Sequence, residues 1–393
     1  MINNYIKNAF RNQRKASQII EYNLNPAGDP LQYSRQTHCQ RTLQNLSHMV
    51  DLYKKPGAEY ANYGGLQSCG SPWVCHVCAI KISEYRKDEI AELIKQVLAA
   101  GYYIYMGTFT LPHYAHESCQ MVNDRFMAAT AKMKNQKPLK GSPCFVPYQQ
   151  VLKQYDCQGY VTTKEPLYGS NGWHIHSHIL YVFKKPINDL VTAREKIWEC
   201  WLKACDLTFQ IADYPDHILK AFYKRSFRLD HLTGDAEKIV SQYMTKAGVV
   251  TKEKQLETWR MEHEMTKGHL KKSETGNMTP WGMLERIRET EDKKEAAHLS
   301  QKFFEFHLAF KGSSFVRWSP GLRPAYGIQQ KTDQEIVDDP ETLLNDLYGF
   351  FEKPEWKIIV KKRLRGWVRQ NSNQPWNDLV QKLNNKIKEK EFA

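Results

Sequence analysis

Apolar residues in this 393-residue chain follow two different spacings. Spacings of three and four residues place one apolar face on a helix, whereas alternation or a short continuous apolar run favours a strand. The spacing predicts helices over 81–100, 117–135, 188–205, 235–246, 279–288 and 296–310. It predicts strands over 102–111, 159–164, 172–183 and 222–229. Gly101 and Gly248 follow two of these helices, as is typical of helix ends.

Histidines occupy alternate positions of the expected strand 172–183, directly after a glycine-marked turn. Alternate side chains leave the same face of a strand, so His174, His176 and His178 point together at a spacing of about 7 Å. A lone histidine is usually structural, but two or three converging imidazoles can bind one divalent cation. Mg²⁺ prefers oxygen ligands, so imidazoles shift the expectation toward Mn²⁺ in competition. The pattern leaves open which histidines bind and whether His174, Glu165 or His113 is the third ligand.

A cluster of cysteines precedes the first long helix. Its members are Cys39, Cys69, Cys75 and Cys78. A Cys-x2-Cys pair lets two thiolates reach one ion, and two further ligands complete the tetrahedron that Zn²⁺ prefers. The sequence therefore predicts a structural zinc site, with His38 or His76 as alternatives to Cys39. A buried cysteine group without a metal is the competing interpretation.

Tyr243 and Lys246 share one face of the expected helix 235–246. A tyrosine hydroxyl is a poor nucleophile at neutral pH because its pKa is about 10. A neighbouring ammonium favours the phenolate, and a divalent cation polarises the phosphorus under attack. Together with the histidines, this pair predicts metal-assisted phosphoryl transfer. Tyr243 would attack in line, giving a 5′-phosphotyrosine ester and a free 3′ hydroxyl.

The overall composition narrows the class of partner and the compartment. A formal charge of +13 and an aromatic content of 12% favour a nucleic-acid partner. No apolar stretch approaches the roughly 18–20 residues that span a bilayer, so we expect no membrane segment. Residues 1–17 lack an apolar segment, and several of the nine cysteines are too closely spaced for a disulfide framework. We therefore expect a cytoplasmic protein.

Seven sequence blocks follow one another in a characteristic order. They are residues 65–82 around the cysteines, 106–111, 172–180, 243–246, 264–268, 279–284 and 317–323. This order resembles the plasmid rolling-circle replication initiators (Rep) of the HUH endonuclease superfamily, over about residues 39–326. In that resemblance the second block carries the strand beside the site, the third the histidines and the fourth the tyrosine.

The resemblance implies a fold, an activity and partners. The fold is α+β, with a central antiparallel sheet that carries the histidines on an inner strand and helices on its faces. The activity is nicking of one strand at a double-strand origin, priming from the 3′ hydroxyl and later strand closure. DNA is the implied partner, together with a host replication helicase and polymerase.

Two positions depart from the pattern of that family. The histidine pair usually stands directly before the apolar end of the strand, which indicates His176 and His178, but Ser177 between them is small and polar. The pair of His174 and His176 also satisfies the letter pattern. Some relatives carry a glutamate four residues before the tyrosine, where this chain has Ile239, so the residue used for termination stays open.

Composition and resemblance together divide the chain into five expected parts. Residues 1–36 are polar and are expected to form a flexible arm, and 37–100 a zinc-binding segment with a helix. Residues 101–250 form the expected HUH endonuclease core, 251–330 its helical continuation and 331–393 a basic helical tail. The tail would either hold duplex DNA or present a solvated helix face.

Two other functions fit the same residues. A transposase or relaxase of the same superfamily would share the chemistry and differ in the DNA that it recognises. A non-catalytic, zinc-containing DNA-binding protein would use the histidines as a second structural zinc site. A covalent protein–DNA adduct separates that last alternative from the nucleases.

Overall fold

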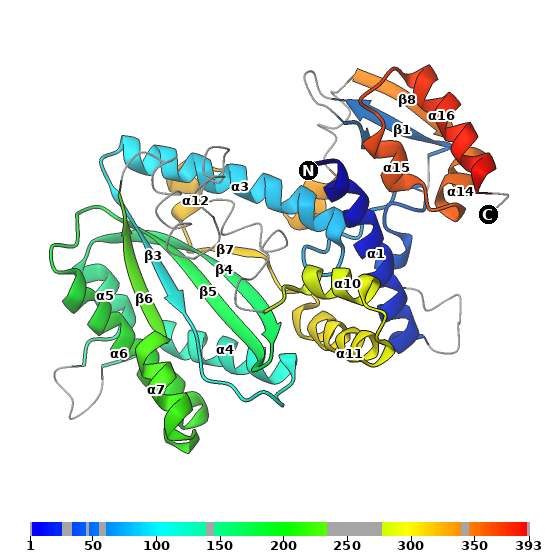
Figure 1. Cartoon of the computed structure of the whole chain (residues 1–393). Coiled ribbons are helices and arrows are strands. Elements are labelled where there is room, and N and C mark those ends of the chain that lie inside the picture. The colour runs from blue at the N-terminus through cyan, green and yellow to red at the C-terminus, as the bar shows by residue number, and fades with distance from the viewer. Residues whose placement is uncertain are drawn as a thin grey trace, which may run out of the picture. The chain divides into compact units, whose positions relative to one another are not determined.

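The computed structural model describes residues 2–25, 34–44, 47–54, 60–138, 145–233, 277–338 and 346–390. The chain divides into two units, each assembled from segments that are distant in the sequence (Figure 1). The first, here called the cysteine unit, comprises Met1–Ile82, Leu284–His307 and Lys331–Ala393. The second, the histidine unit, comprises Ser83–Met283 and Leu308–Gln330. These units differ from the five consecutive parts expected from the sequence, because composition does not report which distant segments pack together.

The histidine unit is built on a five-stranded sheet in the order β6-β3-β5-β4-β7. Its strands are β3 (Tyr103–Phe109), β4 (Cys157–Gly169), β5 (Gly172–Phe183), β6 (Phe227–Leu232) and β7 (Val316–Trp318). Every pair of neighbouring strands in this sheet is antiparallel. The histidine-bearing strand β5 is central, and helices flank the sheet (Figure 1). The expectation of an α+β fold with a central antiparallel sheet and flanking helices is confirmed.

Helices of the histidine unit pack onto the sheet through large aromatic side chains. They are α4 (Cys119–Lys134), α5 (Tyr148–Gln154), α6 (Leu190–Phe209), the 3-10 turn η2 (Ile211–Asp213), α7 (Asp216–Arg225) and α12 (Leu322–Ala325). Trp201 of α6 contacts Phe109 of β3 and Phe126 of α4, with ring centroids 5.2 and 5.5 Å apart. The indole Nε1 of Trp201 also donates a hydrogen bond to the carbonyl of Thr110 at 2.8 Å. One buried side chain thus joins two helices to the strand beside β5.

The hairpin between β4 and β5 fixes the position of the histidines. Its register pairs Gly169 with Gly172, which leaves two residues in the turn. Two-residue hairpin turns favour residues with positive φ, and Gly172 has φ +81°. A Cβ at this position would lie 2.7 Å from the carbonyl oxygen of Ala115. Glycine is therefore required here both by its positive φ and by the close backbone of Ala115.

The cysteine unit has a smaller, three-stranded antiparallel sheet in the order β2-β1-β8. Its strands are β1 (Met49–Lys54), β2 (Asn62–Tyr63) and β8 (Asp346–Glu352). Its helices are α1 (Ile2–Leu24), α2 (Arg35–His38), α13 (Asp333–Asp338), α14 (Lys353–Lys361), α15 (Arg365–Gln370) and α16 (Trp376–Glu389). Three further helices contain residues of both units: α3 (His76–Ala99), α10 (Pro280–Glu289) and α11 (Lys293–Phe310). Within the described residues, no helix combines the length and apolar content needed to cross a membrane.

Both ends of the chain differ from the expectation drawn from composition. Instead of a flexible arm, residues 2–24 form α1, in which Phe10 and Ile20 are buried. Asn12 and Gln13 are buried as well, and their hydrogen-bond partners come from the cysteine segment. The polar composition of α1 thus conceals an inward face. The C-terminal region is not a separate helical tail, because its strand β8 pairs with β1.

Two expected elements require a further remark. Residues 222–229, expected as a strand, are divided between the end of α7 and the start of β6. The expected helix 235–246 and the block 264–268 lie outside the described residues.

The Gly172→Ala substitution should destabilise the histidine unit by about 2–4 kcal/mol, because it adds a backbone clash to an unfavourable φ. Gly101→Ala is the matched control: Gly101 also has positive φ, but a Cβ added there would meet nothing within 4 Å. It should cost about 1 kcal/mol. Urea denaturation followed by tryptophan fluorescence measures both values. Equal losses in the two variants would contradict the role assigned to the Ala115 contact.

Candidate active site and metal centre

Three histidines line one face of the central strand β5. The ring centroids of His174 and His176 are 4.1 Å apart, and those of His176 and His178 are 6.1 Å apart with nearly parallel planes. His178 is buried, whereas His174 and His176 are half-buried. The strand alternation expected from the sequence therefore gathers these rings on one face.

Two of the three histidines belong to separate hydrogen-bonded groups: His178 with Glu165 and Thr108, and His174 with His113. His178 is held at both ring nitrogens: Nε2 lies 3.2 Å from a carboxylate oxygen of Glu165, and Nδ1 lies 3.3 Å from the hydroxyl of Thr108. His174 instead places its Nδ1 2.9 Å from Nε2 of His113. The strand register explains the first group, because Glu165 lies opposite His176 on β4 and Thr108 lies opposite His178 on β3.

Burial keeps the imidazoles of His174 and His113 uncharged. Desolvation, together with the neighbouring His113, lowers the pKa of His174 to about 4, although Glu165 opposes this shift. Desolvation also lowers the pKa of His113. Near pH 7 both rings are therefore uncharged, and one donates its N–H to the lone pair of the other.

Two atoms of the histidine face stand at the separation that two ligands of one cation would have. Two ligand atoms at about 2.1 Å from an octahedral ion lie about 3 Å apart, close to the 3.2 Å between His178 Nε2 and the Glu165 oxygen. Thr108 at the opposite ring nitrogen is the kind of partner that orients a ligating imidazole. A mixed nitrogen and oxygen donor set suits Mn²⁺ or Mg²⁺. Among the described residues, a third ligand atom of the histidine face does not stand as close to these two as the four thiols stand to one another.

Glu165 was one of several third ligands that the sequence left open, and Thr108 was not predicted as a site residue. Thr108 lies within the block 106–111, so its place on a strand beside the site could have been predicted. Its position directly opposite His178 depends on the strand register, which the sequence does not specify.

Tyr243 and Lys246 lie outside the described residues. Tyr214 and Tyr223 are among the tyrosines of the histidine unit that the structure describes. Tyr214 accepts a hydrogen bond from Arg125, and burial raises its pKa to about 12, which disfavours the phenolate. Tyr223 is 46% exposed on α7.

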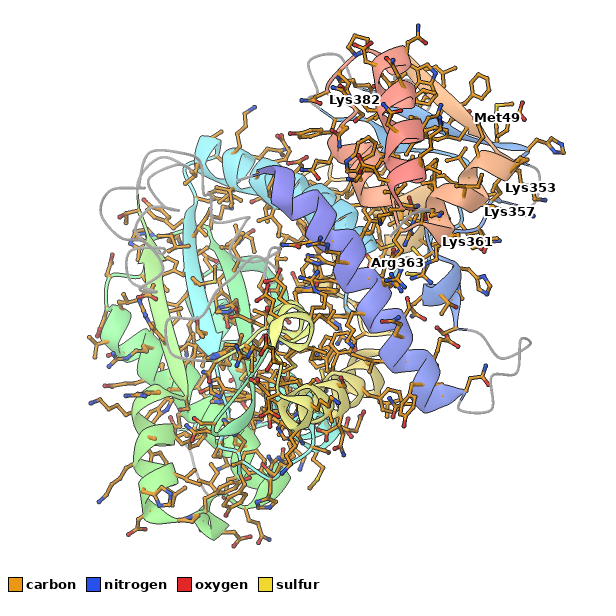
Figure 2. The ribbon with its side chains drawn as sticks, turned by 45° about the vertical axis from the view of Figure 1, so that its right-hand side comes forward. Met49, Lys353, Lys357, Lys361, Arg363 and Lys382 are labelled. Carbon is orange, nitrogen blue, oxygen red and sulfur yellow. The ribbon has the colours of Figure 1, made fainter. Side chains whose placement is uncertain are left out.

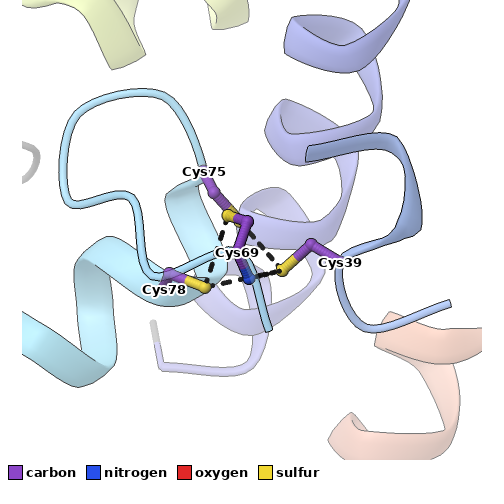
Figure 3. A group of neighbouring side chains, drawn as sticks. All are labelled: Cys39, Cys69, Cys75 and Cys78. Atoms are coloured by element: carbon purple, nitrogen blue, oxygen red, sulfur yellow. Dashed lines mark hydrogen bonds between the residues drawn. The ribbon is translucent and has the colours of Figure 1, made fainter. Parts of the chain in front are cut away.

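Four buried thiols converge in the cysteine unit (Figure 3). Sγ of Cys39 lies 3.5 Å from Sγ of both Cys75 and Cys78, and Cys69 lies 3.7 Å from Cys78. Four sulfurs at about 2.3 Å from a tetrahedral zinc ion would be about 3.8 Å apart. Within the described part of the chain, this is the group in which three or more ligand atoms already stand close enough to hold one ion. The cluster could therefore bind zinc without rearrangement.

The cluster favours a thiolate at Cys75, whereas hydrogen bonds among the thiols raise the pKa of Cys69 and of Cys78 well above the usual value. The amide of Cys69 points to Sγ of Cys39 at 3.4 Å, and the side-chain amide of Gln13 lies 3.4 Å from Sγ of Cys75. Burial opposes ionisation of Cys75, yet hydrogen bonds from Cys39, Cys69 and Cys78 bring the pKa of its thiol well below the usual value. Amides that face sulfur in this way are the usual surroundings of a metal-binding thiolate.

A buried arginine connects this cluster to the C-terminal region. Arg365 donates hydrogen bonds to Oε1 of Gln13 at 3.1 Å and to the carbonyl of Gln40 at 2.7 Å. Burial, followed by repulsion from Arg41, lowers the pKa of Arg365 to about 9, while the nearby sulfurs of Cys39 and Cys75 oppose this shift. Neither Gln13 nor Arg365 was identified from the sequence, because nothing in their local sequence shows that they face the thiols.

The two histidines that were alternatives to Cys39 have other contacts. Nδ1 of His76 lies 2.9 Å from the side-chain amide of Asn12, and desolvation lowers the pKa of His76 to about 3. His38 lies 3.3 Å from the hydroxyl of Thr42. The fourth position of the thiol group is therefore filled by Cys39.

Comparison with known proteins gives one informative similarity. The chain is 22% identical, over 335 residues, to a protein named "Protein rep" from Streptomyces lividans. The aligned region covers 71% of this chain and 68% of that protein. No protein-family model matches the sequence, and no solved structure gives a significant match. The similarity to a Rep protein thus extends over most of both chains rather than over a single motif.

Proposed function

We propose that this protein initiates DNA replication by cutting one DNA strand through a tyrosine nucleophile of the histidine unit. The similarity to "Protein rep" supports a Rep-like replication role. The observation that carries the cleavage mechanism is the set of His176, His178 and Glu165 on one face of the paired strands β4 and β5. Such a set suits a divalent cation at a phosphate.

The proposed cation ligands are His176, His178 and Glu165. His178 and Glu165 already stand at coordinating separation, and His176 lies opposite Glu165 in the strand register. His174 is assigned a positioning role, because it lies opposite Leu167 rather than Glu165 in the strand register and its Nδ1 contacts His113. A bound Mn²⁺ or Mg²⁺ would supply positive charge that polarises the scissile phosphate.

In the proposed reaction the phenol oxygen of Tyr243 forms a bond to phosphorus as the bond to the 3′ oxygen breaks. The tyrosine loses its proton, and the departing oxygen gains one to become a 3′ hydroxyl. Lys246, three residues along an expected helix, would favour the phenolate electrostatically. One phosphoester replaces another, so a 3′ hydroxyl can reverse the step and rejoin the strand without a nucleotide cofactor.

We also propose that Zn²⁺ binds the four cysteines as a structural ion. Their sulfur separations approach the edge of a zinc–thiolate tetrahedron, and the group is fully enclosed by protein. A closed set of four protein ligands is typical of structural rather than catalytic zinc.

Replacing Tyr243 with phenylalanine should abolish a covalent protein–DNA adduct. The purified protein is incubated with Mn²⁺ and single-stranded oligonucleotides that tile the DNA around its gene, and adducts are separated on a denaturing gel. Tyr223→Phe is the matched control, because Tyr223 is exposed on α7 of the same unit. An adduct that survives in Tyr243→Phe would reassign the nucleophile. No adduct with any oligonucleotide would favour a non-catalytic DNA-binding protein.

The three histidines should differ in their effect on that adduct. His176→Ala and His178→Ala should each slow its formation by roughly a hundredfold or more, because each removes a proposed cation ligand. His174→Gln should have a smaller effect, and raising the Mn²⁺ concentration should not change it. Single-turnover rates at several Mn²⁺ concentrations measure this difference. If His174→Gln is the slowest variant and extra Mn²⁺ rescues it, the ligand pair is instead His174 and His176.

Cys75→Ser should remove the zinc and unfold the cysteine unit. Zinc bound to a structural site contributes on the order of 10 kcal/mol, which is comparable with the whole stability of a typical domain. Zinc content by mass spectrometry and thermal denaturation test this, with Cys205→Ser, a buried cysteine of α6, as control. Cys205→Ser should keep one zinc per chain. Full zinc content in Cys75→Ser would overturn the assignment.

A further inference from the structure

A basic cleft opens in the cysteine unit. Helices α1, α10, α15 and α16 and the end of α14 line this cleft, which has a volume of about 1190 Å³. Its charged lining is basic apart from Glu289, among the residues that the structure describes. Representative contributors are Arg14 of α1, Arg288 of α10, Arg363 before α15 and Lys390 after α16. Segments far apart in the sequence therefore bring their cations together here.

A stripe of lysines on α14 leads into the basic cleft (Figure 2). Lys353, Lys357 and Lys361 are spaced by four residues, which places them on one helix face with a rise of about 6 Å between neighbours. All three are exposed, and Arg363 continues the row beyond the helix end. Lys361 and Arg363 also line the cleft. Stripe and cleft thus form one continuous cationic path.

The cations of the cleft repel one another. Desolvation, followed by Arg363, lowers the pKa of Arg14. Desolvation, followed by Arg363 and Lys386, lowers the pKa of Lys390. Lys386 is partly offset by an ion pair with Glu389 at 2.6 Å, but the opposing charges do not balance the whole lining.

Arg288 gives an independent indication that an anion belongs in the cleft. Its Nε and Nη1 atoms are buried and have no hydrogen-bond partner among the described residues. Buried N–H groups without acceptors are costly to the folded protein, and phosphate oxygens are well suited to accept from a guanidinium in pairs. The side chain lines the cleft, so a ligand bound there would supply the missing acceptors.

We propose that the basic cleft and the lysine stripe of α14 bind the phosphodiester backbone of DNA. The length of the cationic path favours a polyanion over a single phosphate, and its concave, arginine-rich part favours a strand that enters it over a flat lipid surface. Trp367, half-buried in the lining, offers a ring on which a base can stack. This inference deepens the proposed replication function by giving the cysteine unit a DNA-binding role separate from cleavage.

The decisive experiment compares two charge-matched double variants in the full, zinc-loaded chain. Arg14→Gln/Arg363→Gln neutralises the cleft, and Lys293→Gln/Lys294→Gln neutralises two exposed lysines of α11 in the same unit that do not line it. Both are made in the Tyr243→Phe background without Mn²⁺, so binding is measured independently of cleavage. Fluorescence anisotropy with a 30-base-pair duplex and a 30-nucleotide single strand reports affinity over a range of salt concentrations.

The cleft variant should bind about 10- to 100-fold more weakly, and its log–log salt slope for the duplex should be smaller by about 2. The control should stay within threefold of the parent. Loss of affinity for either DNA form supports the proposal, and the form with the larger loss identifies the ligand. Equal DNA affinity of the cleft variant and the control variant would reject the proposal. A cleft variant that loses binding to anionic phospholipid vesicles but keeps its DNA affinity would also reject it. If the protein with Tyr243 cleaves DNA but the two double variants bind DNA equally well, the proposed function stands and only the DNA-binding role of the cleft is refuted.

Arg288→Met separates a ligand-binding arginine from a structural one. Removing an unsatisfied charge should leave the melting temperature of the DNA-free protein unchanged or higher. The same variant should bind DNA at least tenfold more weakly. A lower melting temperature with unchanged DNA affinity would show that Arg288 is structural and would overturn its part in the cleft.

Discussion

The antiparallel register of β4 with β5 determines which side chains surround the histidines. It places Glu165 opposite His176, and the adjoining pair of β5 with β3 places Thr108 opposite His178. A slip of one residue would turn every side chain of a strand to the other face, because side chains alternate along it. Gly172 helps to hold this register, since the two-residue turn needs its positive φ. The chemistry proposed for the histidine unit thus depends on a turn that touches no substrate.

The cysteine unit is organised around buried polar groups rather than an apolar core alone. The thiols, Gln13 and Arg365 form one connected network, and a charged guanidinium is buried within it. Such a network is favourable when every member has its partners and costly when one is missing. A cation at the thiols would balance the negative charge of the sulfurs, which links metal binding to the packing of α1 and α15.

The features predictable from the sequence are those set by local spacing. Long helices other than α1 were predicted, as at α4, and the alternation of histidines predicted their shared face. The short strands β1, β7 and β8 were missed, because their pairing partners are remote: β1 pairs with β8, and β4 with β7. The strand β2, which pairs with the nearby β1, is only two residues long and so shows no alternation. The inward face of α1 was missed for the same reason, since its buried amides bond to groups of another segment. The roles of Tyr243 and Lys246 remain predictions from the sequence, as these residues lie outside the described part of the chain.

The segments of the two units alternate along the sequence, which has a consequence for biosynthesis. A ribosome releases the N-terminal segment of the cysteine unit long before β8, α14 and Arg365 have been made. Most of the histidine unit, by contrast, comes from the continuous stretch Ser83–Met283. Contacts between distant segments form late and slowly, because a long loop must close first. The surfaces of β1 and α1 that β8 and α15 cover therefore stay exposed during most of translation, and chaperones would protect them in that interval.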